Sequence, residues 1–317
     1  MKEPHPVGPA TASLPAILSQ LILATRPMFF TASVLPVLLG AAWGARGGRT
    51  LDGEATLIAL VSIVLVHAAV NVLNDVYDEL SGGDRINDDR IYPFTGGSRF
   101  IQNGVFSVRQ MAHWGGVLLA AGCLAGLALF LEKGPTVLAF GAVGVFLGIA
   151  YSSPPLRLAG RGVGELAVGV GFGTLPVVGA AWLQQGQWEA GTFLLSVPVA
   201  LWVALILLVN EIPDAAADAA VGKRTLVVRL GLDGTARLQA ALHLLAAAAV
   251  AYLALRGALP LAAPLVPLLA AAAAARVAGW IREGGRDRSQ LERAVRFTPA
   301  VHAAGTLWLF GCVLWPG

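Results

Sequence analysis

The chain has 317 residues, of which 56% are hydrophobic and only 13% are charged, with a formal net charge of +3 and a mean hydropathy of +0.70. Soluble domains carry about 25% charged residues, so this composition excludes a water-soluble protein. It predicts a polytopic membrane protein, in which an ionisable cluster at membrane depth indicates a functional site.

Apolar runs separated by proline, glycine and charged residues predict nine spanning helices. Each is close to the ~20 residues that a ~30 Å hydrocarbon core requires. The predicted ranges are 20–44, 55–77, 109–131, 135–152, 163–183, 190–212, 235–256, 258–281 and 296–315. Residues 1–19 are expected to form a flexible N-terminal segment without a removable signal peptide, because they contain no compact basic, apolar and cleavage-site sequence.

Positive charges divide unevenly between the loops that join these helices. If successive loops lie on opposite sides, the N-terminus and the loops after the second, fourth, sixth and eighth helices hold 18 of the 22 Lys and Arg residues. The positive-inside rule places this set in the cytoplasm. We therefore predict a multi-pass protein of the inner (cytoplasmic) membrane.

Acidic residues gather after two of the predicted helices, on the side that carries the positive charge. The first group is Asp75, Asp78, Glu79, Asp84, Asp88 and Asp89, and the second is Glu211, Asp214 and Asp218. The groups are four helices apart, which predicts a duplicated four-helix unit, 20–152 and 163–281, within one domain that covers 1–317. For Asp88 and Asp89 a solvated loop face is an equally good interpretation.

The two groups can be aligned with each other. Asn71, Asp75 and Glu79 then match Asn210, Asp214 and Asp218, respectively. The spacing of four predicts that the second set occupies successive turns on one helix face. Stacked carboxylates repel each other, so a cation is expected against them, and oxygen ligands of this kind suit Mg²⁺ bound together with the phosphates of a substrate.

Cations and a glycine-containing loop accompany the acidic residues. Lys223, Arg224 and Arg157 could each hold a phosphate oxygen, although ordinary positive-inside topology explains any one of them equally well. In the loop PFTGGSRFIQNG (93–104), the glycines would let the backbone approach a ligand closely. A plain flexible turn is the alternative for that loop.

Four motifs occur in chain order: TRPMFFTASVLPVLLG (25–40), NDVYDELSGGD (74–84), YSSPPLRLAGRGVGEL (151–166) and NEIPDAAADAAVGKRTLVVRLG (210–231). Together they resemble the motifs of the UbiA superfamily of intramembrane aromatic prenyltransferases. The loop FTGGSRFIQNG, the ending GKRTLVVRLG and the glycine-containing spacer before Asp84 most resemble the branch that prenylates 1,4-dihydroxy-2-naphthoate in menaquinone synthesis.

This resemblance implies an all-α fold with nine transmembrane helices around a central cavity, capped on the cytoplasmic side. It implies Mg²⁺ as cofactor, and a polyprenyl diphosphate and a small aromatic acceptor as substrates; no nucleic-acid partner is expected. The predicted metal ligands are Asn74, Asp75, Asp78, Asp84, Asn210, Asp214 and Asp218. The predicted catalytic residues are Asp78, Asp214, Tyr151 and Arg157, and the predicted diphosphate-binding residues are Lys223, Arg224, Arg26, Ser98 and Arg99.

Some residues and functions remain alternatives. Glu79 is expected to be a bystander, because the family pattern uses Asp78 and Asp84. The histidines His67, His113, His243 and His302 are expected to be packing residues. The acceptor could instead be 4-hydroxybenzoate, homogentisate or a lipid. An ion-coupled transporter would also show internal repeats and intramembrane acids, but near helix centres instead of helix ends.

Overall fold

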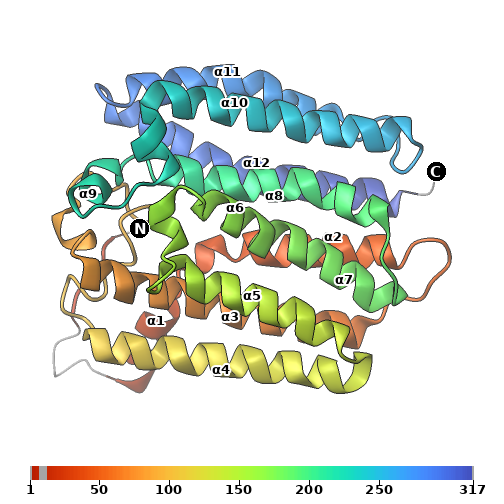
Figure 1. Ribbon diagram of the computed structural model, residues 1–317, viewed down its shortest axis with the longest axis horizontal. Helices are drawn as coiled ribbons and strands as arrows, with labels where there is room; N and C mark the ends of the chain where they lie inside the picture. The colour runs from red at the N-terminus through yellow and green to blue at the C-terminus, as the bar shows by residue number, and fades with distance from the viewer. Residues whose placement is uncertain (1, 7–12, 316–317) are drawn as a thin grey trace.

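The structure is a computed structural model that describes residues 2–6 and 13–315, and every regular element within those ranges is helical. Figure 1 shows the long helices running side by side. The α-helices are α1 Leu14–Ala24, α2 Thr31–Gly44, α3 Gly53–Ser81, α4 Val108–Lys133, α5 Thr136–Ser152, α6 Gly164–Val168, α7 Leu175–Gln185, α8 Ala190–Asn210, α9 Ala215–Ala220, α10 Leu226–Leu255, α11 Leu265–Glu283 and α12 Arg288–Leu314. Short helical turns lie at η1 Pro27–Phe29, η2 Asp84–Ile86, η3 Leu158–Arg161 and η4 Gly169–Thr174.

Helix lengths agree with the predicted all-α membrane fold. Within the described residues, eight helical segments are long and apolar enough to cross a membrane. A further apolar helix, α5, has 17 residues and occupies the fourth predicted span. At 1.5 Å per residue it is roughly 25 Å long, slightly shorter than the hydrocarbon core. Each of the nine predicted spans therefore corresponds to an apolar helical segment.

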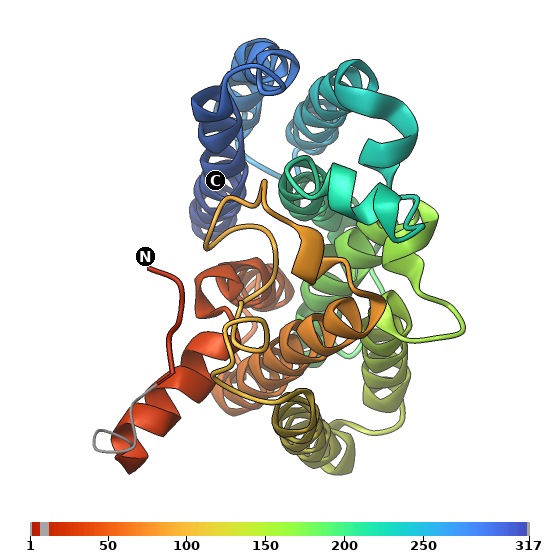
Figure 2. The ribbon, with the colours of Figure 1, turned by 90° about the vertical axis from the view of Figure 1, so that its left-hand side faces the viewer.

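The first predicted span, 20–44, is wrong as a single helix. The backbone of Arg26 is left-handed (φ 55°), and Pro27 follows it. A proline disfavours helical geometry in the residue before it, so the chain breaks here into α1 and α2. Residues 14–19, expected to be flexible, belong to α1, which lies at the edge of the bundle in Figure 2. The predicted four-helix duplication stays a prediction.

The predicted span 163–183 consists of α6, a π-helical turn (η4) and α7. Two glycines allow this turn to pack tightly against α8. A Cβ atom at Gly173 would lie 2.3 Å from the Cα atom of Ala200, and one at Gly169 would lie 2.9 Å from the Ala200 carbonyl oxygen. Any larger residue would push the turn away from α8, and π turns of this kind are frequent at functional sites.

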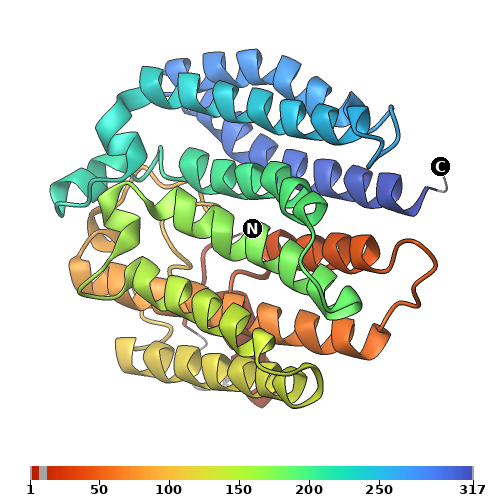
Figure 3. The same cartoon turned by 45° about the vertical axis from the view of Figure 1, so that its right-hand side comes forward.

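The two largest of four apolar clusters among the described residues contain most of the buried hydrophobic residues of the bundle. The larger joins α2, α8, α10, α11 and α12 and includes the fully buried Trp43, Trp202 and Leu309. The smaller lies mainly between α3 and α4, around Val72 and Met111. In Figure 3, α8, α10, α11 and α12 lie on one side of the molecule, α3, α4 and α5 lie on the other, and α2 lies between the two sets. A large cavity is bordered by helices of both sets.

Candidate active site

The cavity has a volume of about 1150 Å³, and apolar side chains and glycines form most of its wall. Both acidic motifs reach it. Asp78 and Asp84 line it from the first motif, and Asp214 and Asp218 line it from the second. We call this region the carboxylate end of the cavity. These carboxylates are 130 to 140 positions apart in the chain, and the packing of α3 and α8 around a common space brings them to the same end of the cavity.

The first motif lies on the last turns of α3, which ends where Gly82 adopts a left-handed conformation (φ 83°). Asn74 and Asp78 are one turn apart and point into the cavity. The Asn74 amide donates to Asp78 Oδ2 at 3.1 Å and to the Ser152 hydroxyl of α5 at 3.0 Å. The amide therefore fixes the orientation of the Asp78 carboxylate.

The second motif is not the single helix face that its spacing predicts. α8 ends at Asn210, and α9 begins at Ala215. Pro213 lies between them, and it lacks an N–H group and disfavours helical geometry at the preceding residue. Asp214 and Asp218 are still one turn apart, since the Asp218 N–H donates to the Asp214 carbonyl oxygen at 2.9 Å. Both carboxylates and Asn210 line the cavity despite the break.

Lys223 joins the two motifs. Its ammonium lies 2.6 Å from Asp78 Oδ1 and 3.3 Å from Asp218 Oδ1. These carboxylates raise the pKa of Lys223, against the opposing effect of its burial, so the side chain is a fixed positive charge. One cation thus bridges α3, which carries Asp78, and α9, which carries Asp218.

The loop after α3 is tied to both motifs by two backbone N–H groups and the side-chain amide of Asn87. The Ser98 N–H donates to both carboxylate oxygens of Asp75, at 3.2 Å each. The Gly96 N–H donates to Asp214 Oδ2 at 3.1 Å, and the Asn87 amide donates to Asp214 Oδ1 at 2.7 Å. Asp75, a predicted metal ligand, is buried beneath this loop and does not line the cavity.

The electrostatics of the carboxylate end favour an added cation. Burial, followed by repulsion from Asp78, Asp75 and Asp214, raises the pKa of Asp84 to about 8. Burial raises the pKa of Asp218 to about 6, even though Lys223 acts in the opposite direction. Within the described residues no group of three or more His, Cys, Asp or Glu side chains is already arranged as a metal site. The oxygen-rich set nevertheless fits Mg²⁺, which takes one or two carboxylates together with substrate phosphates.

The other predicted site residues are the predicted diphosphate-binding residues and the two predicted catalytic residues that lie outside the acidic motifs. Only some of them line the cavity. Tyr151 and Arg26 line the cavity, and Arg26 donates to the Phe94 carbonyl oxygen at 2.8 Å. Arg99 is buried and donates to the Asp84 carbonyl oxygen, and Ser98 is buried beside it. Arg157 and Arg224 are exposed and lie outside the cavity wall. The structure does not bring these last two together with the carboxylates, and their roles stay predictions.

Glu79 faces away from the cavity. One of its carboxylate oxygens forms an ion pair with Arg85, and the other accepts from the Gln102 amide at 3.1 Å. Glu79 and Asp78 are neighbours in sequence, but α3 turns them to different faces. The side chain of Glu79 secures the loop after α3.

Many of the residues that line the cavity were absent from the predicted site, among them Asn71, Asn87, His67 and Phe172. The spacing of Asn71 from Asn74 and Asp78 could have indicated it, since residues three and seven positions apart share a helix face. The packing role expected for His67 is incomplete, because its side chain also lines the cavity. No sequence pattern around Asn87 or Phe172 indicated that either residue would line the cavity.

An apolar membrane cavity that ends in two facing carboxylate motifs is suited to a substrate with a long apolar part and an anionic head, provided that a divalent cation lies between the head and the carboxylates. A family model described as the UbiA prenyltransferase family matches residues 33–298. The chain therefore belongs to the UbiA prenyltransferase family and is an enzyme of the prenyltransferase class.

Two curated relatives carry more specific names. The chain is 32% identical over 275 residues to 1,4-dihydroxy-2-naphthoate octaprenyltransferase of Mycobacterium tuberculosis, covering 86% of this chain and 89% of that protein. It is 31% identical over 234 residues to 2-carboxy-1,4-naphthoquinone phytyltransferase of Synechocystis, covering 73% and 72%, respectively.

The fold also matches a solved structure. A UbiA homologue from Archaeoglobus fulgidus, bound to GPP and Mg²⁺, superposes with a TM-score of 0.66 at 17% sequence identity, covering 92% of this chain and 99% of that one. At this identity the likeness supports the fold alone, and it confirms the predicted all-α polytopic architecture.

A glycine in the loop after α3 should be essential for activity. Gly97 has φ +73°, and a Cβ atom there would lie 2.5 Å from Asp84 Oδ2. Gly97→Ala should therefore displace the Asp84 carboxylate and lower prenyl transfer about 100-fold, the usual cost of a misplacement near 1 Å. Transfer would be measured in membranes that contain equal amounts of each variant.

The matched control is Gly104→Ala. Gly104 has a similar φ of +70°, but a Cβ atom there meets no atom within 4 Å. The Gly104→Ala variant therefore has a similar backbone strain but no new contact with Asp84. Equal losses in the two variants would show that strain in the loop, and not the position of the carboxylate, causes the effect.

Proposed function

We propose that this protein transfers a polyprenyl group from an allylic diphosphate to 1,4-dihydroxy-2-naphthoate in a Mg²⁺-dependent reaction. The observation that carries the proposal is the pair of carboxylate motifs that meet at one end of a large apolar cavity. The names of the two curated relatives support a naphthoate-type acceptor. The A. fulgidus homologue bound to GPP and Mg²⁺ supports a prenyl diphosphate and this metal.

Each end of the cavity suits one part of the donor. Metal-binding side chains would be Asn74, Asp78, Asp84, Asn210, Asp214 and Asp218, with Asp75 positioning the loop beside them. When bound, Mg²⁺ would supply positive charge that neutralises the diphosphate. Lys223 and Arg26 lie at the same end and would stabilise the charge that grows on the leaving diphosphate. The apolar wall would hold the polyprenyl tail.

In the reaction, the allylic carbon of the donor and one ring carbon of the acceptor each lose one bond, and a new bond forms between them. The C–O bond to the diphosphate breaks, and the diphosphate leaves with the electron pair. The ring carbon that bears the carboxylate attacks the allylic carbon, and loss of CO₂ from that ring carbon restores aromaticity. The product is the reduced form of demethylmenaquinone. The water-poor cavity would protect the allylic cation from hydrolysis.

Charge distribution supports an orientation. The acidic motifs lie in the loops that share the excess of Lys and Arg, so we place the carboxylate end on the cytoplasmic side of the inner membrane. Membership of a prenyltransferase family favours this enzyme over the ion-coupled transporter that intramembrane acids alone would also allow.

Incubation of membranes that contain the protein with Mg²⁺, a polyprenyl diphosphate and a panel of aromatic acceptors tests the proposal. Mass spectrometry should identify prenylated, decarboxylated product with 1,4-dihydroxy-2-naphthoate, and EDTA should abolish its formation. Excess Mg²⁺ added after EDTA should restore it. Product with 4-hydroxybenzoate or homogentisate alone would contradict the acceptor, and activity that EDTA leaves unchanged would contradict the metal requirement.

A further inference from the structure

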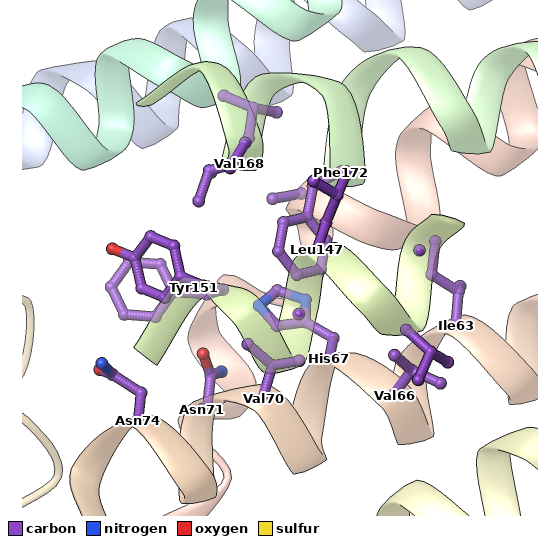
Figure 4. Close-up of a pocket in the computed structure, with 18 of the residues that line it drawn as sticks. Ile63, Val66, His67, Val70, Asn71, Asn74, Leu147, Tyr151, Val168 and Phe172 are labelled. Carbon is purple, nitrogen blue, oxygen red and sulfur yellow. The ribbon is translucent and has the colours of Figure 1, made fainter. Parts of the chain in front are cut away.

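Two polar side chains of α3, Asn71 and His67, line the cavity beyond the carboxylate end. They are four residues apart, so they lie on one helix face with a separation near one turn, ~5.4 Å. Figure 4 shows both of them projecting from α3 toward the space that Tyr151 and Phe172 enter from the other side. Asn74 follows on the same face, toward the carboxylates. The neighbouring positions on α3 that line this space, Ile63, Val66 and Val70, are apolar.

Each of the two side chains is held in place at one atom. The Asn71 amide nitrogen donates to the Thr25 carbonyl oxygen at 2.9 Å. His67 Nδ1 and the buried Ser33 hydroxyl form a hydrogen bond of 2.7 Å. Asn71 Oδ1 and His67 Nε2 have no hydrogen-bond partner among the described residues. Two fixed polar side chains thus keep one unused atom each in a mostly apolar wall, where unpaired polar groups are costly.

Aromatic rings border the same space. The His67 ring lies 4.3 Å from the Phe172 ring, centroid to centroid, and 5.4 Å from the Phe30 ring. Phe172 belongs to the π turn η4, which the small glycines Gly169 and Gly173 allow to pack against α8. The turn therefore aims an aromatic ring at His67. A flat aromatic ligand would find both planar apolar surface and polar atoms here.

We infer that this part of the cavity binds the aromatic acceptor, with its hydroxyls hydrogen-bonded to Asn71 and His67 and its ring against Phe172. The two oxygens of a 1,4-dihydroxyarene lie at opposite ends of the ring, a separation close to the ~5.4 Å of one helical turn. A hydroxyl both donates and accepts, so either tautomer of His67 can serve. The inference rests on the proposed function and adds the location of its second substrate.

The orientation of the acceptor follows from the reaction. The ring carbon that bears the carboxylate is adjacent to the 1-hydroxyl and must lie nearest to the allylic diphosphate. The 1-hydroxyl is therefore assigned to Asn71, which is closer to the carboxylate end along α3, and the 4-hydroxyl is assigned to His67. His67 then distinguishes 1,4-dihydroxy-2-naphthoate from 1-hydroxy-2-naphthoate, which lacks the 4-hydroxyl.

Two substitutions at His67 test this assignment. In His67→Asn the amide takes the place of Nδ1, so the contact with Ser33 is retained and the group at Nε2 is lost. In His67→Gln the amide reaches the place of Nε2. Titration of each acceptor into purified protein would measure its Kd without turnover, and initial rates would give separate KM values for acceptor and donor.

The wild-type protein should bind 1,4-dihydroxy-2-naphthoate about 10-fold more tightly than the 1-hydroxy analogue, the factor expected for one hydrogen bond. His67→Asn should bind the two compounds equally, and His67→Gln should recover part of the preference. The KM for the polyprenyl diphosphate should change less than about 2-fold in both variants. Because the comparison of the two acceptors is also made on the wild-type protein, a variant that fails to fold leaves the test intact.

His302→Asn is the matched control, since His302 is a fully buried histidine of α12 outside the cavity wall. It should keep the wild-type preference. An equal preference in wild type and His67→Asn, or a change in the donor KM alone, would overturn the inference. A wild-type protein that binds 1,4-dihydroxy-2-naphthoate with the stated preference but forms no prenylated product would support this binding site and contradict the proposed function.

Discussion

Replacing Asp78 by asparagine should lower the rate of prenyl transfer about 1000-fold, the upper range for removing one group that stabilises a transition state. The Asp78 carboxylate accepts from Asn74 and pairs with Lys223 at the meeting point of the two motifs. Asparagine has the same shape but carries no negative charge. The variant should fold and insert in the membrane, and its activity should not recover at high Mg²⁺.

Glu79→Gln is the matched control for this change, because it also neutralises a buried carboxylate at the end of α3. Glu79 lies outside the cavity wall and contacts Arg85 and Gln102. Its loss should alter activity less than about 5-fold, in line with a carboxylate that makes no transition-state contact. Full activity in Asp78→Asn would refute the two-motif model. Equal losses in the two variants would show that the duplication alignment, which uses Glu79, has the correct register.

Features that depend on neighbours in sequence could be predicted. The positions of the apolar spans follow from composition, and the i, i+4 pairing of Asn74 with Asp78 follows from helical geometry. The break at Pro213 could also have been predicted, since proline is incompatible with the continuous helix that the spacing of Asn210, Asp214 and Asp218 suggested. The spacing of four residues is compatible with a helix but does not require one, whereas the missing N–H group of Pro213 removes a helical hydrogen bond.

Features that depend on packing between distant segments could not be predicted. Lys223 contacts Asp78 at a sequence separation of 145, and Asn87 contacts Asp214 at a sequence separation of 127. Positive-inside topology explains the exposed Arg157 and Arg224 as well as a site does, so sequence could not separate them from Lys223. In the same way, a histidine in an apolar run reads as a packing residue until the cavity beside it is known. His67 lines the cavity, whereas His302 does not.

Filling the apolar part of the cavity should change which prenyl donors are accepted. Gly144 of α5 lines the cavity, and a Cβ atom at this position would meet no atom within 4 Å. It lies seven residues from Tyr151, or ~10 Å along the helix, and therefore away from the carboxylate end. Gly144→Phe should lower kcat/KM for a long polyprenyl diphosphate about 100-fold and for geranyl diphosphate less than about 3-fold, since only a long tail would meet the new ring.

Gly116→Phe provides the comparison, because Gly116 of α4 is exposed, lies outside the cavity wall and has equal room for a Cβ atom. Its donor preference should match that of the wild type. A Gly144→Phe variant that loses activity equally with short and long donors would mean that the ring disturbs the carboxylate end. An unchanged preference would mean that the tail follows another path. Because the two substitutions add the same ring to two lipid-embedded helices, a difference between them can come only from where that ring points.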